Sequence, residues 1–585
     1  MSLDVARLIA FSGIMATETQ ISVASSNISN ADTTGYTKKT ANQSANVTDG
    51  VGTGVSITGI SSNVDKLLLK SLIGATSDLG SADTTNNYMT ELEQLFGSAN
   101  SNGTSTTGTS LANSLSSLES ALSSLASSPS SVSLQSAVVS ALDDVASQLR
   151  DTSSGIQTLR SNADQDIGSS VTSINSDLKQ ISDLNVEIRK MGAAGQSTAD
   201  LEDERKSALQ DLSSYMNVSY YTASNGDLQV YTSSGQALVD SSAHTLSYST
   251  SANVTASTSY SSGGFSGITV NGVDITSQIT SGKIGALVTL RDQTLPAEQS
   301  QLDQLATQLK SALNSVTNGA SSVPAPSSLT GTSTVASTDA LSATGTVRIA
   351  VTDQSGNLVS YQDLDLSSYS TVGDLVTALN GISGVSASID SSGHLVVSST
   401  ASGDGVAIND MTSSVSGAGF SDYFGMNDLV TGTGASDFAV RSDILSGAAG
   451  LPTDTLDSSA SLTTGSQVLS SGSATVINSL YNALTGSRSF SAAGGLSATS
   501  GSFANYAAAI VANVASKASQ ASSTYTAKET AQSTYASSLS SETGVNIDEE
   551  TARVSSLQNK YAAASQLISA VNSMFSSLIT AMQSG

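Results

Sequence analysis

Two histidines and two acidic clusters are the groups in this sequence that could carry out chemistry. His244 and His394 could act as general bases or metal ligands, but neither lies near a nucleophile motif or a second ligand at metal-binding spacing. We interpret each as a solvated or strand-face histidine in a predicted β region. The acidic clusters Asp200–Glu204 and Asp548–Glu550 could supply paired carboxylates. We interpret them as solvated charge, and the second as negative charge favoured by the positive end of a C-terminal helix. The sequence therefore predicts no catalytic residue and no metal site.

The glycine-rich stretch Gly50-Val-Gly52-Thr-Gly54 resembles a phosphate-binding loop, but it lacks the third glycine at the required spacing and a following Lys-Ser or Lys-Thr. No Gly-x-Ser-x-Gly, His-Glu-x-x-His or EF-hand sequence occurs. The chain has no cysteine, which excludes disulfide bonds, thiol catalysis and cysteine-bound zinc. We therefore expect a protein that is not an enzyme and holds no cofactor.

The composition favours an acidic, folded protein of several domains, because 585 residues exceed what one core usually holds. Lys and Arg number 22 against 48 Asp and Glu, a net charge of −26, which argues against nucleic-acid binding and against docking on anionic membranes. No uninterrupted apolar run of transmembrane length occurs, and no apolar segment with a cleavage site follows the first residues. We expect neither a transmembrane span nor a Sec signal peptide.

An amphipathic helix is predicted over residues 3–30. Its apolar stripe, widened by Phe11 and Met15, consists of Leu3, Ala10, Ile14, Thr17, Ile21, Ala24 and Ile28. The segment 30–36 favours a turn, because Asn30 and Gly35 tolerate positive φ. A short strand is expected at 52–60, and helix resumes at 65–72.

The C-terminal stripe is more regular than the N-terminal one. Its apolar residues follow alternating steps of three and four: Val554, Leu557, Tyr561, Ala564, Ile568, Val571, Phe575, Leu578 and Met582. This is the period of a coiled-coil seam of about four heptads. A single helix cannot bury such a seam, so we expect the two terminal helices to pair with each other and with other subunits. Pairing within one chain alone is the simpler alternative.

Apolar stripes between the two ends predict a long helical rod or bundle, at residues 111–125, 134–149, 156–188, 201–212 and 302–316. Glycines at 192 and 195 should end the third of these helices. The period changes to that of strands at 217–270, around a hairpin at Asn225-Gly226. Residues 345–399 favour the order strand, strand, helix, strand, strand.

We therefore predict a mixed, multidomain fold: a terminal α-helical coiled coil, a long helical rod or bundle, and inserted β-rich domains. The expected division by residue number is 1–65 (N-terminal helix, turn motif and short strand, paired with 540–585), 66–215 (helical rod), 216–285 (β-rich domain), 286–320 (helix returning to the rod), 321–450 (inserted β-rich surface domain), 451–539 (mixed segment returning to the rod) and 540–585 (C-terminal coiled-coil helix).

The sequence Asn27-Ile-Ser-Asn30-Ala-Asp-Thr-Thr-Gly-Tyr36 resembles the N-terminal motif of the bacterial flagellar rod, hook and hook-associated proteins, with Ser29 where alanine is common. The segment 52–60 is similar to the strand that follows in that family. At the other end, Thr543-Gly-Val-Asn-Ile-Asp-Glu-Glu550 and the seam after it resemble the C-terminus of a hook-associated member. This start and the long middle favour a hook-associated protein over the hook and rod proteins. The 345–399 segment resembles domains of flagellins.

The resemblance implies an extracellular structural protein of the flagellum, exported unfolded by the flagellar type III machine and polymerised as a ring or short tube between hook and filament. The implied partners are other copies, the hook protein, a second junction protein (hook-associated protein 3) and an export chaperone at the C-terminus, with no nucleic acid and no membrane insertion. The expected assembly interface consists of the nine seam residues together with Leu3, Ala10, Ile14, Ile21, Asn27, Ile28, Asn30, Gly35 and Tyr36.

Two further interpretations stay open. The chain could be another axial protein of the hook or rod type. It could also be a secreted adhesin or surface-layer protein that binds through its β-rich domains, because a low content of charge and a richness in Ser and Thr fit that class as well.

Overall fold

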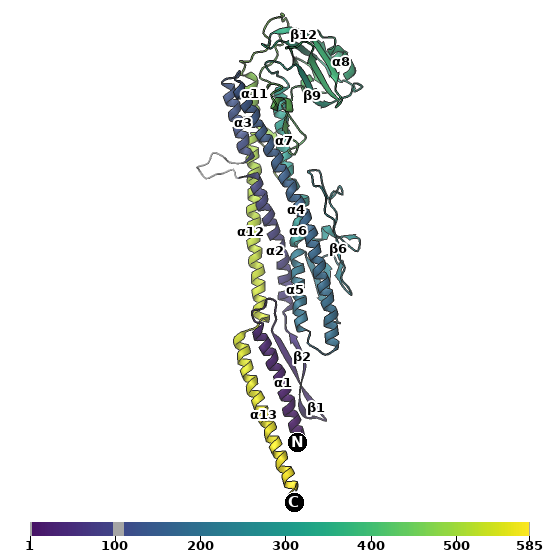
Figure 1. The fold of residues 1–585 in the computed structure, drawn as a ribbon, viewed down its shortest axis with the longest axis vertical. Helices are drawn as coiled ribbons and strands as arrows, with labels where there is room; N and C mark the ends of the chain where they lie inside the picture. The colour runs from purple at the N-terminus through teal and green to yellow at the C-terminus, as the bar shows by residue number, and fades with distance from the viewer. Residues whose placement is uncertain (1–2, 98–109, 584–585) are drawn as a thin grey trace.

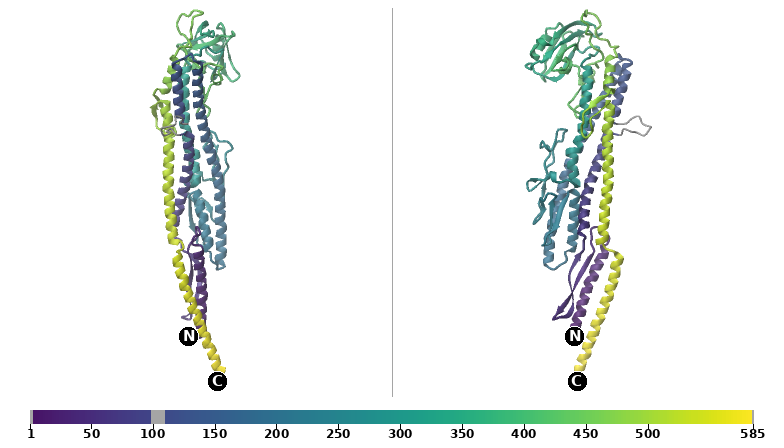
Figure 2. Two further views of the ribbon diagram at one scale, coloured as in Figure 1. Left: turned by 60° about the vertical axis from the view of Figure 1, so that its left-hand side comes forward. Right: turned by 180° about the vertical axis from the view of Figure 1, so that it is seen from behind.

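The computed structural model describes residues 3–97 and 110–583 of the chain. The molecule is a long rod, with both chain ends at one extremity and a β-rich domain at the other (Figure 1). Long helices run along the middle of the rod, and a smaller β-rich segment lies on one side of them (Figure 2). The predicted combination of long helices with inserted β-rich parts is confirmed.

The terminal part of the rod consists of two helices and one hairpin. Helix α1 (Leu3–Ser29) lies beside helix α13 (Ile547–Gln583), and the hairpin of β1 (Lys39–Thr48) and β2 (Val51–Ser62) packs on α1. Only the second of these strands is predicted by the sequence. Strand β1 was missed because its outer seven residues are all exposed and mostly polar, so no apolar alternation marks it.

The middle of the rod is a bundle of helices that share one continuous core. They are α2 (Lys66–Phe96), α3 (Leu111–Ala126), α4 (Val132–Ala193), α5 (Ala199–Tyr215), α6 (Gly282–Thr289), α7 (Leu295–Thr317), α11 (Thr475–Thr485) and α12 (Phe503–Thr543), with a π-helical turn at Leu290–Thr294 between α6 and α7. A small hairpin of β19 (Arg488–Phe490) and β20 (Thr499–Gly501) precedes α12.

Two helices are longer than the sequence predicts. The stripes at 134–149 and 156–188 belong to a single helix of 62 residues, α4. The polar residues around Gly155 resemble a break, but the missing side chain at Gly155 leaves room for Leu95 of α2, whose Cδ1 would lie 2.8 Å from an added Cβ. Helix α2 begins where predicted, with the Asp65 carboxylate capping the amides of Leu67 and Leu68, and then continues to Phe96.

The first β-rich segment is less regular than its sequence suggests. Strands β3 (Val218–Thr222) and β4 (Leu228–Thr232) form the predicted hairpin, and β5 (Ala237–Val239) extends the sheet. Beyond it only two-residue strands occur, namely β6 (Leu246–Ser247), β7 (Thr269–Val270) and β8 (Val273–Asp274). The loops are held instead by Arg160 of α4, a buried side chain that donates to the carbonyl oxygens of Thr255 and Arg291.

The β-rich domain at the far end has its own core, separate from that of the rod. The predicted order of two strands, a helix and two strands is confirmed in β11 (Thr346–Thr352), β12 (Leu358–Asp365), α8 (Val372–Leu379), β13 (Val385–Ile389) and β14 (His394–Ser399). Two strands outside the predicted module complete its sheets: β15 (Gly405–Asn409) pairs with β11, and β9 (Ser328–Thr334) pairs with β14.

Strand β10 (Ala343–Thr344) precedes β11 and pairs with β16 (Ser414–Val415). Short elements then return the chain to the rod: α9 (Phe420–Phe424), β17 (Val430–Thr431), β18 (Ala439–Val440) and α10 (Ser442–Leu445). Phe438 and Val440 pack in the rod core, whereas Leu456 and Leu469 pack on the outer domain. The chain therefore contacts the rod before residue 450 and the outer domain again after it. The domain boundary at residue 450 stays a prediction.

Candidate assembly site at the chain termini

Helices α1 and α13 run antiparallel. Asn27 hydrogen-bonds Glu550, and further along the pair Ile21 lines a small notch together with Gln558 and Tyr561. Helix α13 has 37 residues and α1 has 27, so this register carries the last turns of α13 past the start of α1 (Figure 1). The C-terminal end of the predicted seam therefore has no partner helix within the described part of the chain.

The predicted interface residues divide by burial. Ala10, Leu557 and Val571 are buried, as is Asn27, whereas Tyr561, Leu578 and Met582 are exposed. The others are partly buried: Leu3, Ile14, Ile21, Ile28, Asn30, Gly35, Tyr36, Val554, Ala564, Ile568 and Phe575. The structure thus brings the two stripes together along most of their length, and which of these residues contact other subunits stays a prediction.

Further apolar side chains of the pair face solvent. On α1, Leu8, Phe11 and Met15 are each more than half exposed, and on α13 Met574 is 51% and Met582 78% exposed. Leu567 and Ile579 add to this surface and were missed, because the search for a seam selects one stripe of a helix and these residues lie beside it. Apolar surface of this kind marks interaction sites.

The apolar surface also qualifies the prediction of no membrane span. Among the described residues, the helical stretch Phe503–Gln583 contains an 18-residue window with a mean hydropathy of 1.2, of which 6% is buried. This meets the length and composition of a membrane span, which for a single helix is weak evidence. Ser and Asn residues recur between the apolar positions of α13, which gives the helix one polar side and one apolar side.

A buried polar network, which we name the joint, holds the terminal pair to the rod. It consists of Asn27, Gly35, Tyr36, Thr37, Lys38, Lys39, Asp203, Lys206 and Glu550. Asn27 is fully buried, and its amide donates to the carbonyl oxygen of Lys39 at 2.9 Å and to the Glu550 carboxylate at 3.2 Å. Its side-chain oxygen accepts from the Lys39 amide and from the Tyr36 hydroxyl, each at 3.0 Å.

The joint reaches the start of α13 through Lys38. Its ammonium group lies 2.9 Å from Glu549 and 3.2 Å from Glu550, and its backbone amide donates to the carbonyl oxygen of Thr543 at 2.8 Å. Glu550 is fully buried, and Arg553 lies 3.6 Å from it. The Asn27 amide, Lys38 and Arg553 therefore surround this buried carboxylate.

On its other side the joint reaches α5. The Asp203 carboxylate accepts from the Thr37 amide at 3.0 Å and from the Thr37 hydroxyl at 2.6 Å. Lys206 bridges Asp203 and the carbonyl oxygen of Gly35, with distances of 3.0 and 2.9 Å. Lys39 adds an ion pair with Asp200, and its ammonium group lies 4.1 Å from the centre of the Tyr36 ring. The turn motif is thus held between the C-terminal helix and the rod.

The electrostatics of the joint follow from burial and pairing. Burial opposes the charge on Lys38, but hydrogen bonds to Glu549 and Glu550 outweigh it and raise its pKa. The same hydrogen bond lowers the pKa of Glu549. Burial lowers the pKa of Lys39 and raises that of the Tyr36 hydroxyl. Lys38 and Glu549 therefore hold their charges as a pair.

The joint corrects the interpretation as solvated charge for one residue of each acidic cluster, because Asp203 and Glu550 are buried. Asp200, Glu204, Asp548 and Glu549 are exposed. Asp548, Glu549 and Glu550 lie in the first turn of α13, as predicted for negative charge at the positive helix end. The same turn is capped by Asn546, whose side chain accepts from the amides of Asp548 and Glu549. Lys38, Lys39 and Lys206 were missed as well. The one signal in the sequence is the Lys38-Lys39 pair directly after the turn, in a chain with few cations.

Glycine 54 explains the glycine-rich stretch. Its φ is +133°, and an added Cβ would lie 2.2 Å from the Ser12 hydroxyl of α1. That hydroxyl accepts from the amide of Val55 at 3.1 Å, so the hairpin backbone lies directly on the helix. The stretch therefore serves close packing in this fold.

Replacing Gly54 with valine should detach the hairpin from α1, at a cost of about 2–3 kcal/mol from backbone strain and the clash. Protease cleavage between residues 40 and 60 should become faster. Gly52→Val is the matched control, because nothing lies within 4 Å of a Cβ at Gly52. Equal cleavage of the two variants would contradict this account.

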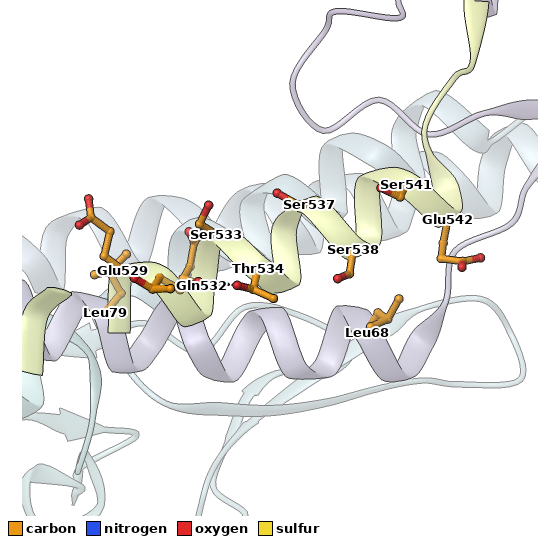
Figure 3. A pocket seen from close by; sticks show the side chains of 11 residues that line it. Leu68, Leu79, Glu529, Gln532, Ser533, Thr534, Ser537, Ser538, Ser541 and Glu542 are labelled. Atoms are coloured by element: carbon orange, nitrogen blue, oxygen red, sulfur yellow. Dashed lines mark hydrogen bonds between the residues drawn. The ribbon is translucent and has the colours of Figure 1, made fainter. Parts of the chain in front are cut away.

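No arrangement in the described residues resembles a reaction centre. No group of three or more potential metal-binding side chains occurs in residues 3–97 and 110–583. His244 and His394 each lie beside an aspartate four residues earlier, at 3.1 and 3.5 Å. A long groove of about 1050 Å³ between α2 and α12 is lined mostly by Ser and Thr, and its two carboxylates, Glu529 and Glu542, lie at opposite ends (Figure 3).

Four protein-family models match parts of the chain. They are described as the flagellar hook-associated protein FlgK helical domain (residues 89–323), the flagella basal body rod protein (8–37), the flagellin hook IN motif (346–401) and the flagellar basal body rod FlgEFG protein C-terminal (537–581). Among curated proteins, flagellar hook-associated protein 1 of Salmonella typhimurium is 24% identical over 315 residues, which are 52% of this chain and 55% of that protein. The same protein of Escherichia coli K12 is 24% identical over 313 residues.

The chain is similar to the flagellar hook-associated proteins, whose helical-domain model matches residues 89–323. The alignments span about half the length of the curated relatives that it matches. A solved structure, that of the flagellar hook junction protein FlgK from Burkholderia pseudomallei, is similar with a TM-score of 0.47 and 17% identity, over 80% of this chain and 98% of that one. The hook-associated family is one of flagellar structural proteins and not of enzymes. The two models of basal body rod proteins fall mostly on α1 and α13, the helix pair described above.

Proposed function

We propose that this protein polymerises outside the cell as the junction between the hook and the filament of the bacterial flagellum. The observation that carries the proposal is the unpartnered C-terminal end of α13, where Leu578 and Met582 are exposed past the start of α1. Burying a large apolar side chain contributes about 1.5–3 kcal/mol, so neighbouring helices gain by covering this end. The terminal pair then forms a coiled-coil bundle with the pairs of adjacent subunits.

The partners in this proposal are other copies of the chain, the hook protein and hook-associated protein 3, with an export chaperone binding the C-terminal seam before assembly. Export proceeds through the flagellar type III machine, and the chain acts without catalysis, cofactor, nucleic acid or membrane insertion. Similarity to the hook-associated proteins and the amphipathic character of α13 support this assignment. A helix with one polar side suits contacts between proteins better than a lipid environment.

Deleting residues 555–585 in the bacterium tests the proposal. The deletion removes the seam but leaves the core of the rod intact. We expect lost motility and the release of filament subunits as monomers into the medium, measured by swimming assays and by immunoblotting of culture supernatant. Normal swimming with lost attachment to surfaces would favour an adhesin instead, and loss of the hook itself would favour a hook or rod protein.

A further inference from the structure

A second surface of the molecule is open to a neighbour, on the rod side of the joint and separate from the α1–α13 pair. A groove of about 840 Å³, which we name the side groove, runs between α2 and the sheet of β3. Its floor is apolar and is formed by Leu69, Ile73, Leu209, Val218, Tyr220 and Leu228. Gly74 of α2 also lines it and presents no side chain toward the space.

One wall of the side groove is a free strand edge. The sheet has the order β3-β4-β5, so β3 is an edge strand, and all of its residues, Val218–Thr222, line the groove. Alternate amide and carbonyl groups of an edge strand have no partner in the sheet and can pair with an added strand. The shape and the edge together suit an extended segment that lies along α2.

The charge of the side groove is unusual for this chain. Four cations and three carboxylates line it, while the whole protein carries −26. Two of the carboxylates are already paired, Asp203 within the joint and Asp78 with Lys528 at 2.7 Å. Lys66 and Lys70 are exposed and form no ion pair with the residues that the structure describes. These two lysines at the side groove therefore favour an extended segment that carries a carboxylate.

The tip of the β1–β2 hairpin has these properties. Val47 is 63% exposed and Val51 52% exposed, and Asp49 lies between them in the turn. The hairpin is a two-stranded sheet, so each strand also has an unpaired edge among the described residues. The hairpin tip cannot reach the side groove of its own chain. Ser62 and Asn63 at the base of the hairpin line that groove, whereas the tip points toward the chain ends (Figure 1). Ten residues of strand separate base and tip by about 30 Å.

We infer that the side groove receives the hairpin tip of a second copy of this chain. The inference rests on the proposed polymerisation and names a contact additional to that of the terminal helices. Asp49 of one copy lies beside Lys66 and Lys70 of the next, Val47 and Val51 cover the apolar floor, and the hairpin adds a strand to the β3 edge.

Thiol cross-linking tests this contact, since the chain has no cysteine of its own. A Val51→Cys chain and a Lys70→Cys chain with different affinity tags are assembled together and treated with a short bis-maleimide. We expect a covalent dimer that carries both tags in the polymer and none in dilute monomers. The matched control replaces Lys70→Cys with Lys190→Cys, an exposed lysine of α4 that does not line the groove, and should give no such dimer.

The outcomes separate this inference from the function on which it rests. A polymer without the mixed dimer overturns the hairpin contact and leaves the junction role in place. Failure of the unmodified chain to polymerise in any flagellar context overturns the junction role itself. A cross-link from Lys70→Cys to a different flagellar protein assigns the groove to that protein and also overturns the contact.

Charge reversal gives a second measurement that does not depend on thiol geometry. Asp49→Lys and Lys70→Glu should each raise the concentration needed for assembly about three- to tenfold, and the combined variant should return to within about twofold of the original. Losses that simply add in the combined variant would contradict the contact. Lys190→Glu is the control and should leave the concentration unchanged.

Discussion

Replacing Met574 and Leu578 with aspartate should abolish polymerisation while leaving the monomer folded. Both side chains are more than half exposed on the free end of α13, so the monomer loses little. A contact that buries them gains about 3–6 kcal/mol for the two, and the aspartates remove this gain and add the cost of burying charge. Sedimentation and electron microscopy of the purified chain measure assembly, and circular dichroism measures folding.

A matched variant separates this effect from added charge alone. Ser576→Asp and Thr580→Asp have the same spacing on α13 and are also exposed, but they lie about 200° around the helix from the first pair. We expect normal assembly from this control. Equal loss of assembly in both variants would show that charge on any side of α13 is harmful and would remove the argument for an apolar contact.

Replacing Glu550 with alanine should release the terminal pair from the joint. The buried carboxylate holds Asn27 at 3.2 Å and Lys38 at 3.2 Å, and breaking a buried ion pair costs about 3–5 kcal/mol. We expect rapid hydrogen exchange throughout α13 and loss of assembly, while the core of the rod keeps its protection. Exchange measured by mass spectrometry on the monomer resolves the two regions.

The neighbouring residue supplies the control for this experiment. Glu549 contacts the same lysine at 2.9 Å, but its side chain is 66% exposed and water replaces the contact when it is lost. Glu549→Gln should therefore exchange like the unmodified chain. If Glu549→Gln has the larger effect of the two, the surface pair and not the buried network holds the helix.

The sequence was most informative where a repeating pattern survives in the fold. The stripe of α3 is visible from spacing alone, because one side of that helix is buried. Strand β11 is visible because Val and Ile recur in it, although both of its sides are buried. The seam of α13 is visible from its spacing although much of it is exposed. Strand β1 has no buried side along most of its length and therefore left no pattern. The length of α4 was hidden by Gly155, which serves contact with α2.

The joint could not be predicted from the same reasoning. Its members come from three places in the chain that lie more than 150 residues apart, as the contacts from Thr37 to Asp203 and from Asn27 to Glu550 show. A single charged or amide side chain leaves no repeating pattern in the sequence. Its hydrogen-bond partner depends on how the helices pack. The turn motif could be recognised by resemblance, but the reason for its residues is visible only when α5 and α13 meet around it.

The length of α4 gives the joint a mechanical consequence. With 62 residues the helix spans about 93 Å, and it ends near the joint while the outer β-rich domain sits at its opposite end. A change of about 5° in the angle between the terminal pair and the rod moves that far end by about 8 Å. A few hydrogen bonds of the joint therefore set the position of the outer β-rich domain at the other end of the rod.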